Sequence, residues 1–551
     1  MLFDSVEQVG IPQSLKWPLL RVKAPVVHPG AYAYHLRFCR RSRHSSVVKK
    51  VMEEEQDWKL DRRILELALP ALGTLAIDPL LSLVDTAYVG HLGSDPLSAL
   101  APATGVFTAT FLVFNFLSQA TTPLVGQALG SRDLATARRT VVLAQIFAAT
   151  IGITSCTALQ LWGTKALALV SGGDIVNQSP QVLDLAVTYL RLRALGLPAV
   201  LVGNVSSGAL RALLDTKTPL RIAIGCNVVN AVLDPVLIFG IPAFGFSGIG
   251  IGGAALSTVV AEWVSVVWFV LALAQTEIGL PIPRTASQDA AERLRNDPEQ
   301  PLMTPSIDVE KDKERPYKPA GVAQEDGEDG GDDDDNHASF PPSPLILTQI
   351  VPILQASGAL LLRTVSLQSV LLLSTTTIAN GPDGQLGLAA HQVSLQVWLF
   401  LSFVLDSIET AAQALIAEST GQGQQRQCKA IAKRSLLYGV GLGTVAMLMI
   451  LGCHQYVPQL FTSDDSIVHL AAGTLILVAC MQPLNGVAFV GDGILSGKGD
   501  FKYMSFMMVA SAAVAIPVLI MGDGSLEATW WGLFLFMVAR TGGVALRIGV
   551  A

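Results

Sequence analysis

Charged residues are scarce in this chain. Asp, Glu, Lys and Arg make up 15% of its 551 residues, whereas 51% are hydrophobic and the mean hydropathy is +0.48. About a quarter of the residues of an ordinary soluble domain are charged. The composition therefore excludes a soluble globular protein and indicates an integral membrane protein.

Cysteine is also scarce, and no pair has the C-x-x-C spacing. The six positions are Cys39, Cys156, Cys226, Cys428, Cys453 and Cys480. Cysteines scattered in this way predict neither a disulfide framework nor a metal site. We expect no bound metal and no cofactor beyond a coupling ion, H⁺ or Na⁺.

Acidic residues are absent from a long stretch near the start of the printed sequence. Residues 8–52 contain nine Lys or Arg and no Asp or Glu, and they include no continuous apolar stretch that would mark a secretory signal. A basic, acid-poor segment is typical of an organelle transit peptide. The alternative is a disordered cytosolic tail, because serine is only modestly represented. We treat 1–63 as a basic N-terminal segment.

Apolar stretches that reach the length of a bilayer span, about 20 residues, recur from Ile64 onward. They are interrupted once, at 281–344, a Pro-rich segment with 16 Asp or Glu against 7 Lys or Arg in 281–340. Such a composition predicts a disordered linker. The expected spans are 65–90, 97–121, 135–162, 183–210, 219–240, 250–275, 345–378, 386–417, 430–452, 467–495, 502–521 and 527–548.

Lys and Arg gather in alternate loops between these spans. Because basic loops are retained on the cytoplasmic or equivalent side, both termini and the linker are expected on that inner side. The basic loop residues are Arg132, Arg138, Arg139, Arg211, Lys217, Arg221, Arg426, Lys429, Lys433, Arg434, Lys498 and Lys502.

The two halves of the chain repeat each other. Residues 235–240 read PVLIFG and residues 517–522 read PVLIMG, at an offset of 282 that also relates Pro70 to Pro352. Matches at an offset of 285 are Pro198 with Pro483, Gly208 with Gly493 and Asp215 with Asp500. With six spans per half, the repeats share one orientation.

The repeat predicts an all-α, polytopic membrane protein. Its twelve transmembrane helices would form two six-helix lobes related by the duplication. The N-lobe is expected at 64–280 and the C-lobe at 345–551.

A polar stripe marks the fifth expected span. Asn227, Asn230 and Asp234 are spaced i, i+3 and i+7, so their side chains share one face of a helix. Pro235 follows and removes a backbone donor beside the carboxylate, which predicts a bend there. A carboxylate in an apolar span is costly unless it faces a polar cavity and holds a proton, an ion or a partner. Asp234 is therefore the first candidate for a functional residue.

The first expected span carries a second stripe, Asp78, Ser82 and Asp85. Two acidic helices in one half predict a shared pocket. The alternative for Asp78 is that it lies beside Pro79 only because the helix bends there. The alternative for Asp85 is that it lies near the outer end of the span, where water can solvate it. Other polar side chains of this half could complete a hydrogen-bond network or serve helix packing: Tyr189, Asn204 and Thr258.

The C-terminal half does not copy the acidic stripe, because the repeat offset places Ile516 opposite Asp234. The acidic pocket is therefore expected to be one-sided. Asp406 and Asp492 could form a cation or substrate site. Alternatively, they could gate the interface between the two bundles or lie at solvated loop ends. His391 could titrate near neutral pH, or instead form structural hydrogen bonds. Glu409 is a further acidic residue of this half.

Several stretches together resemble the multidrug and toxic compound extrusion (MATE) family, in particular its DinF-like branch. The resemblance covers about residues 60–550, and the acidic linker departs from it. The stretches are LALPALGTLAIDPLLSLVDTAYVGHLG (67–93), NAVLDPVLIFG (230–240), GGAALSTVV (252–260) and GLAAHQV (387–393).

The resemblance implies an exporter whose two lobes open alternately to either side of the membrane, driven by H⁺ or Na⁺ antiport. It matches Asp85 and Asp234 to the acidic pair of the N-lobe. Asp492 matches an acidic position of the C-lobe. The cation site of that lobe is less clearly preserved here, which favours protons over sodium. By the same likeness, the accompanying polar network falls on Tyr189, Asn204, Asn230 and Thr258.

Desolvation and a neighbouring like charge both favour the neutral form of a carboxyl group. We therefore expect Asp234, close to Asp85, to take up a proton from the outer side and thereby trigger release of substrate. The expected partners are a small organic substrate and the lipid bilayer, with no nucleic acid, and we expect a monomer. Similar plant and algal proteins are often found in plastids, so the chloroplast envelope is the expected location, with the plasma or vacuolar membrane as alternatives.

Two other functions are compatible with parts of the sequence. A flippase for lipids or lipid-linked precursors would need a cleft rich in Arg and Lys, and the spans hold few. An intramembrane protease is suggested by Gly497–Asp500 (GxGD) and Gly245–Gly248 (GxSG). Both matches lie in expected loops of a Gly-rich chain, where they arise by chance, so we expect no enzymatic activity.

Overall fold

The computed structural model describes residues 46–114, 116–170, 180–241, 245–279 and 345–550. The linker 281–344 and the basic segment up to residue 45 lie outside them. Residues Asp61–Ala551 form one compact unit, to which the account below refers. In the other unit, Met1–Leu60, the described part is the start of α2, where Lys59 pairs with Glu55 at 2.9 Å.

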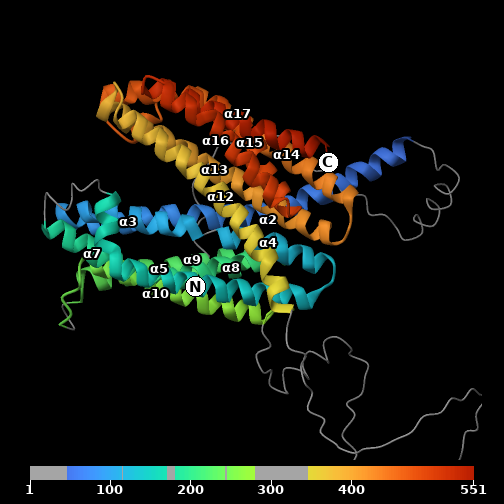
Figure 1. The fold of residues 1–551 in the computed structure, drawn as a ribbon, viewed down its shortest axis with the longest axis horizontal. Helices are drawn as coiled ribbons and strands as arrows, with labels where there is room; N and C mark the ends of the chain where they lie inside the picture. Colours follow the sequence, from blue (N-terminus) through green and yellow to red (C-terminus); the bar gives the residue numbers. More distant parts are fainter. Residues whose placement is uncertain (1–45, 115, 171–179, 242–244, 280–344, 551) are drawn as a thin grey trace, which may run out of the picture. The chain divides into compact units, whose positions relative to one another are not determined.

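The described residues form α-helices, one 3-10 turn and no strand. Figure 1 shows α3–α10 grouped together, in blue to green, and α12–α17 grouped together, in yellow to red. The helices are α2 (Ser46–Gly90), α3 (Ser94–Phe114), α4 (Phe116–Gly130), α5 (Leu134–Val170), α7 (Pro180–Ala194), α8 (Leu197–Ala212), α9 (Lys217–Phe239), α10 (Ile251–Ala274), α12 (Leu345–Ala379), α13 (Gly384–Gly421), α14 (Gln425–Cys453), α15 (Asp465–Gly497), α16 (Phe501–Met521) and α17 (Leu526–Val550), with the 3-10 turn at Pro458–Leu460.

The expected membrane spans are confirmed as helices. Within the described residues, ten helices are long and apolar enough to cross a membrane, or eleven if the bent pair α7 and α8 counts as one span. The first expected span, 65–90, falls within α2, where some side chains are not described. Each remaining span agrees with a helix or helix pair to within a few residues, except that α4 and α5 extend further at their C-terminal ends than the expected spans do. The apolar lengths therefore predicted the architecture.

The duplication is visible in how corresponding helices end. Helix α9 runs through Pro235 and ends four residues later with Gly240 as its C-cap, and α16 runs through Pro517 and ends in the same way at Gly522. One pair of counterparts differs. The span that is continuous in α15 is broken in the first half, where α7 and α8 meet at an angle of 43°.

The break between α7 and α8 follows from local sequence. Pro198 stands in the first turn of α8 and cannot donate a backbone hydrogen bond to α7. Carbonyl groups of α7 and the break are bonded by side chains instead, because the Trp263 indole donates to Leu195 O at 3.2 Å and the Gln160 amide donates to Arg191 O at 2.8 Å. The broken span is thereby stabilised within the apolar phase.

Buried apolar side chains form cores within each group of helices, two of them in the first group, and a further core between the groups. The first group packs around residues such as Val89, Ala103 and Leu190, and the second around Trp530 and its neighbours. The core between the groups joins α4, α5 and α8 to α12, α15, α16 and α17. We call the first group, together with the end of α2 that contributes Val89 to its core, the N-lobe, and we call the second group the C-lobe.

Candidate functional site

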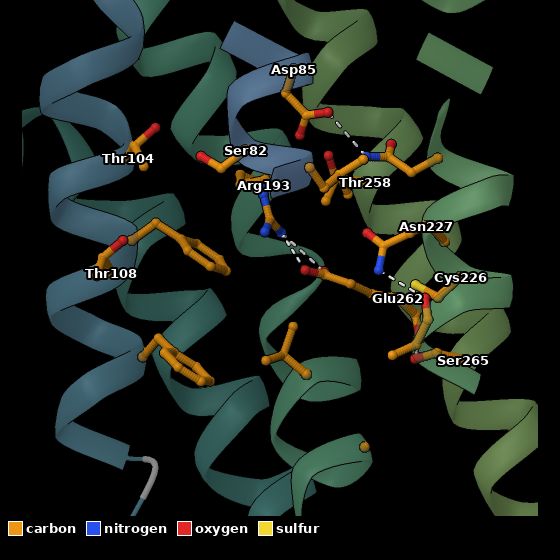
Figure 2. Close-up of a pocket in the computed structure, with 18 of the residues that line it drawn as sticks. Ser82, Asp85, Thr104, Thr108, Arg193, Cys226, Asn227, Thr258, Glu262 and Ser265 are labelled. Carbon is orange, nitrogen blue, oxygen red and sulfur yellow. Dashed lines mark hydrogen bonds and ion pairs between the residues drawn. The ribbon is translucent and has the colours of Figure 1, made fainter. Parts of the chain in front are cut away.

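A cavity of about 770 Å³ opens within the N-lobe. Its lining comes from α2, α3, α7, α8, α9 and α10. Figure 2 shows Thr104 and Thr108 on one side, Asn227, Cys226 and Ser265 on the other, and Asp85 with Thr258 at the upper end of the view. A volume of this size fits a small organic molecule.

The two candidate carboxyl groups meet at this cavity. Asp85 lines it from α2, and the carboxyl group of Asp234 on α9 interacts with that of Asp85. Asp234 is fully buried and also accepts a hydrogen bond from the hydroxyl of Ser257 on α10. Asn230, one turn before Asp234, donates to Asp85 Oδ1 at 3.2 Å. Two interacting carboxyl groups cannot both ionise easily, so the pair is built to hold a proton.

The polar stripe of α9 behaves as its spacing predicted, with one difference. Asn230 and Asp234 are buried and point to α2, whereas Asn227 is partly exposed and donates to its own helix, at Ala223 O, over 2.8 Å. The helix continues through Pro235. The stripe therefore brings two of its three side chains to the acidic pair.

The other residues predicted for this half also border the cavity. Tyr189, Asn204, Asn230 and Thr258 are part of its lining. The Thr258 hydroxyl donates to Ala254 O within α10. The side chain of Asp78 lies outside the described residues, so its predicted role stays a prediction.

A charged pair in the cavity was not predicted from the sequence. Arg193 of α7 and Glu262 of α10 face each other, with Arg193 Nη1 at 2.8 Å from Glu262 Oε1 and 3.0 Å from Oε2 (Figure 2). Both side chains are 14% exposed. The signal was a lone acidic residue, Glu262, in one expected span and two arginines, Arg191 and Arg193, in another span of the same half. Their pairing depends on the bend after α7, which sequence spacing does not specify.

The C-lobe has buried charges of its own, at the acidic residues that the sequence analysis named there. Asp492 of α15 lies between Arg363 of α12 and Arg540 of α17, whose Nη2 is 2.6 Å from Asp492 Oδ2. Asp406 and Glu409 of α13 interact electrostatically with this group. Asp492 already pairs with two guanidinium groups, whereas the carboxylate of an open cation site would be available to bind an ion.

His391 lies apart from these charges. It is fully buried, its Nε2 is 3.4 Å from the Thr375 hydroxyl, and its ring lies edge-on to Trp530 at 5.6 Å between centroids. These contacts are those of a packed histidine. The predicted roles of His391, Asp406 and Asp492 in transport stay predictions.

The matches to protease motifs lie away from the cavity. Asp500, the acidic residue of the GxGD match, pairs with Arg547 at 2.7 Å. Ser247, in the GxSG match, belongs to the loop after α9. Among the described contacts, neither residue lies beside a second group that would activate it.

The cavity has few basic side chains. Arg193 is the only Lys or Arg among its described lining residues, whereas a phosphate head group would require several.

Comparison with known proteins agrees with this fold. The MatE family profile matches residues 70–236 and again residues 361–521, once in each lobe. "Protein DETOXIFICATION 44, chloroplastic" of Arabidopsis thaliana is 31% identical over 504 residues, which cover 89% of this chain and 82% of the relative. "DNA damage-inducible protein F" of Escherichia coli is 25% identical, with 87% of this chain and 90% of the relative covered.

Solved structures share the fold. A variant of the Vibrio cholerae MATE transporter VcmN superimposes with a TM-score of 0.71 at 15% identity, covering 90% of this chain and 97% of that one. A multidrug resistance MATE transporter of the MOP superfamily in an outward-facing conformation gives a TM-score of 0.68 at 17% identity, covering 89% and 96%. At these identities, the likeness concerns the fold.

Proposed function

The chain belongs to the MatE family, and from this membership we propose that it is a secondary active efflux transporter, which exchanges protons for small organic compounds by alternating access. The relatives are transporters and not enzymes. The observation that carries the proposal is that Asp85 lines a cavity large enough for an organic molecule, where it accepts a hydrogen bond from Asn230 and interacts with the buried carboxyl group of Asp234.

The acidic pair is the proposed coupling site. An ionised pair would attract a proton from the outer side, since two adjacent carboxylates repel each other and lie in a medium that disfavours charge. Uptake of the proton removes that charge and weakens the hold of α2 on α9 through Asn230. The N-lobe cavity can then close and expel its contents.

The energy scale is sufficient for such coupling. Each proton that moves through 100 mV brings about 2.3 kcal/mol, which corresponds to a change in substrate affinity of about fifty-fold. One proton per cycle therefore supports export against a considerable gradient.

Protons are the proposed coupling ion rather than sodium. In the C-lobe, both guanidinium partners of Asp492 bond to one carboxylate oxygen, so that carboxylate already has positive counter-charge. In the N-lobe, the interaction of two carboxyl groups favours a shared proton.

The chloroplast envelope is the proposed location. Two relatives, DETOXIFICATION 44 and DETOXIFICATION 45 of Arabidopsis thaliana, carry the word chloroplastic in their names, and the basic, acid-poor segment 8–52 is typical of a transit peptide. Fusion of residues 1–63 to a fluorescent protein should direct it to chloroplasts. A diffuse cytosolic signal would contradict this location.

The function is tested in proteoliposomes loaded with a fluorescent organic cation under an imposed pH gradient. Wild type should export the cation, and Asp85→Asn and Asp234→Asn should lose gradient-driven export while remaining folded. Asp184→Asn is the matched control, because Asp184 is an exposed residue of α7 in the same lobe. Normal export by Asp234→Asn, or export driven by a sodium gradient alone, would contradict proton coupling.

A further inference from the structure

The guanidinium of Arg193 is held in the cavity by two features at once. One is the Glu262 carboxylate, with both oxygens within 3.0 Å of Nη1. The other is the ring of Phe107 on α3, whose centroid lies 4.1 Å from Arg193 Cζ. A carboxylate beside an aromatic face is the recognition that an organic cation needs. Arg193 therefore fills, from within the chain, a site suited to a cationic ligand.

The position of Glu262 is built into the break between α7 and α8. A side chain at Gly196, in this break, would place its Cβ only 2.0 Å from Glu262 Oε2. Glycine at this position thus makes room for the carboxylate. The Trp263 indole, on the next residue of α10, bonds to Leu195 O beside it. The bend between α7 and α8 therefore provides the space that the Glu262 carboxylate occupies.

Arg193 also interacts electrostatically with Asp85 of the acidic pair. Other titratable groups around it are Tyr189 on its own helix, Cys226 on α9 and Asp234 behind Asp85. The described lining residues of α3 and α8 bear no titratable group. Arg193 is thus shared between two negative centres, and only one of them, the Asp85–Asp234 pair, is proposed to change its charge during transport.

We propose that Glu262 and Phe107 form an organic-cation site that Arg193 occupies while the Asp85–Asp234 pair is protonated, and that ionisation of the pair draws Arg193 away and opens the site to substrate. This rests on the proposed proton antiport and adds to it the residues that would hold a cationic substrate and the group that links the two events. Loss of one proton adds one negative charge beside Arg193, and entry of a monovalent cation at Glu262 offsets that charge.

The test is equilibrium binding of radiolabelled tetraphenylphosphonium to the full-length protein in lipid nanodiscs, at acidic and alkaline pH. This aromatic cation keeps its charge at every pH, so a pH dependence belongs to the protein. Wild type should bind it more tightly at alkaline pH. Arg193→Gln should bind about tenfold more tightly than wild type at acidic pH, with its pH dependence flattened. Arg191→Gln, an exposed neighbour on α7, should match wild type.

Two further variants keep the test decisive if Arg193→Gln fails to fold. Glu262→Gln should lower binding of the cation at every pH. Phe107→Leu leaves all charges in place and should weaken binding several-fold at alkaline pH. Binding of an uncharged dye, Nile red, should be unaffected by Glu262→Gln. A merely structural ion pair predicts the opposite for Arg193→Gln, namely equal or weaker binding at acidic pH.

Failure of this inference is distinguishable from failure of the proposed function. If pH-driven export is lost in Asp234→Asn while Arg193→Gln binds the cation no more tightly than wild type, the antiporter stands and the role of Arg193 is refuted. If wild type exports no cation under a pH gradient and its binding does not depend on pH, both are refuted.

Discussion

A single carboxylate oxygen of Asp492 accepts hydrogen bonds from two buried guanidinium groups. Arg363 and Arg540 both donate to Oδ2, and the Arg540 guanidinium also stacks on Phe489 at 4.7 Å. The exposed fractions of these side chains are 11% for Arg363, 1% for Arg540 and 0% for Asp492. The residue therefore balances charges that have little access to water.

Asp492→Asn should destabilise the C-lobe by about 3–5 kcal/mol, because it leaves buried positive charges without their partner. Thermal denaturation of the purified variant, followed by fluorescence-detected size exclusion, measures the effect. Adding Arg540→Gln should recover part of the lost stability. A melting temperature equal to that of wild type for Asp492→Asn alone would contradict the structural role.

Asn230 and Asn227 provide a matched pair on one helix. Asn230 donates to Asp85, whereas Asn227 donates to its own backbone. A hydrogen bond to a charged group contributes about 1.5–3 kcal/mol. Asn230→Ala should therefore slow pH-driven efflux by about tenfold or more, while Asn227→Ala should have a small effect. Equal losses in the two variants would show that the contact with Asp85 has no special role.

At this scale, sequence spacing located the acidic pair but not its surroundings. Asp85 and Asp234 each follow from a helical stripe in an apolar span, since a charge there requires a polar environment. Glu262 is the only charged residue of its expected span, whereas Arg193 shares its span with other charged residues, and no spacing rule pairs the two. Their contact is created by the bend before Gly196, which is a property of three-dimensional packing.

At the scale of helices, α4 and α13 meet at their C-terminal ends without room for side chains. A Cβ at Gly130 would lie 2.2 Å from Glu418 O, and one at Gly421 would lie 2.1 Å from Gln127 O. Gln127 also donates to Gly497 O at 2.9 Å. These ends lead into the basic loops, so the two lobes are closed against each other on the proposed inner side.

Gly130→Ala should therefore separate the lobes on the inner side and favour the inward-open state. Labelling of a single cysteine introduced near this contact, in a background without native cysteines, reports the change as increased accessibility. Gly441→Ala is the control, because a Cβ at Gly441 meets nothing within 4 Å. Unchanged labelling in Gly130→Ala would contradict a closed inner face held by this contact.

The start of α5 is stabilised by Asp133, which lies in a loop outside the membrane-spanning helices. It accepts hydrogen bonds from the Thr136 hydroxyl at 2.7 Å and the Thr136 amide at 2.9 Å. The hydroxyl bond is the main cause that lowers the pKa of Asp133 below its ordinary value of 3.8. A lowered pKa adds stability above the pKa of the unfolded chain, and this stability is lost as the pH falls through the folded value.

Asp133→Ala should accordingly lower the melting temperature at neutral pH, and the difference from wild type should narrow as the pH falls below 3.8. Scanning fluorimetry across a pH series in detergent measures this. Glu277→Gln, at an exposed residue after α10, serves as the control. A difference that is constant with pH would mean that the carboxylate charge does not contribute.

Helix positions were largely predictable, because the length of an apolar stretch decides whether it can span a bilayer. The expected span 386–417 lies within α13, and 502–521 differs from α16 by a single residue. The division of 183–210 into α7 and α8 was not predicted. Pro198 was its local signal, but the matching Pro483 lies inside the continuous helix α15, so proline alone does not decide the bend.

At the scale of the whole molecule, the two lobes carry charge in different ways. The N-lobe has an acidic pair and an ion pair bordering an open cavity, whereas the charges of the C-lobe are largely neutralised by one another. The lobes also share a polar contact, since Arg363 lies 3.4 Å from Gln119 Oε1 of α4. In the proposed cycle, the N-lobe binds proton and substrate in turn, and the shared interface closes one face while the other opens.

The central claim is that substrate and protons move in opposite directions through one site. The most direct measurement is the reverse of efflux: proteoliposomes containing a pH-sensitive dye, with no initial pH gradient, receive an outward gradient of tetraphenylphosphonium at zero membrane potential. Our account predicts that the interior acidifies as the cation leaves, and that Asp85→Asn and Asp234→Asn abolish the acidification. Exit of the cation through the wild-type protein without any change in internal pH would contradict it.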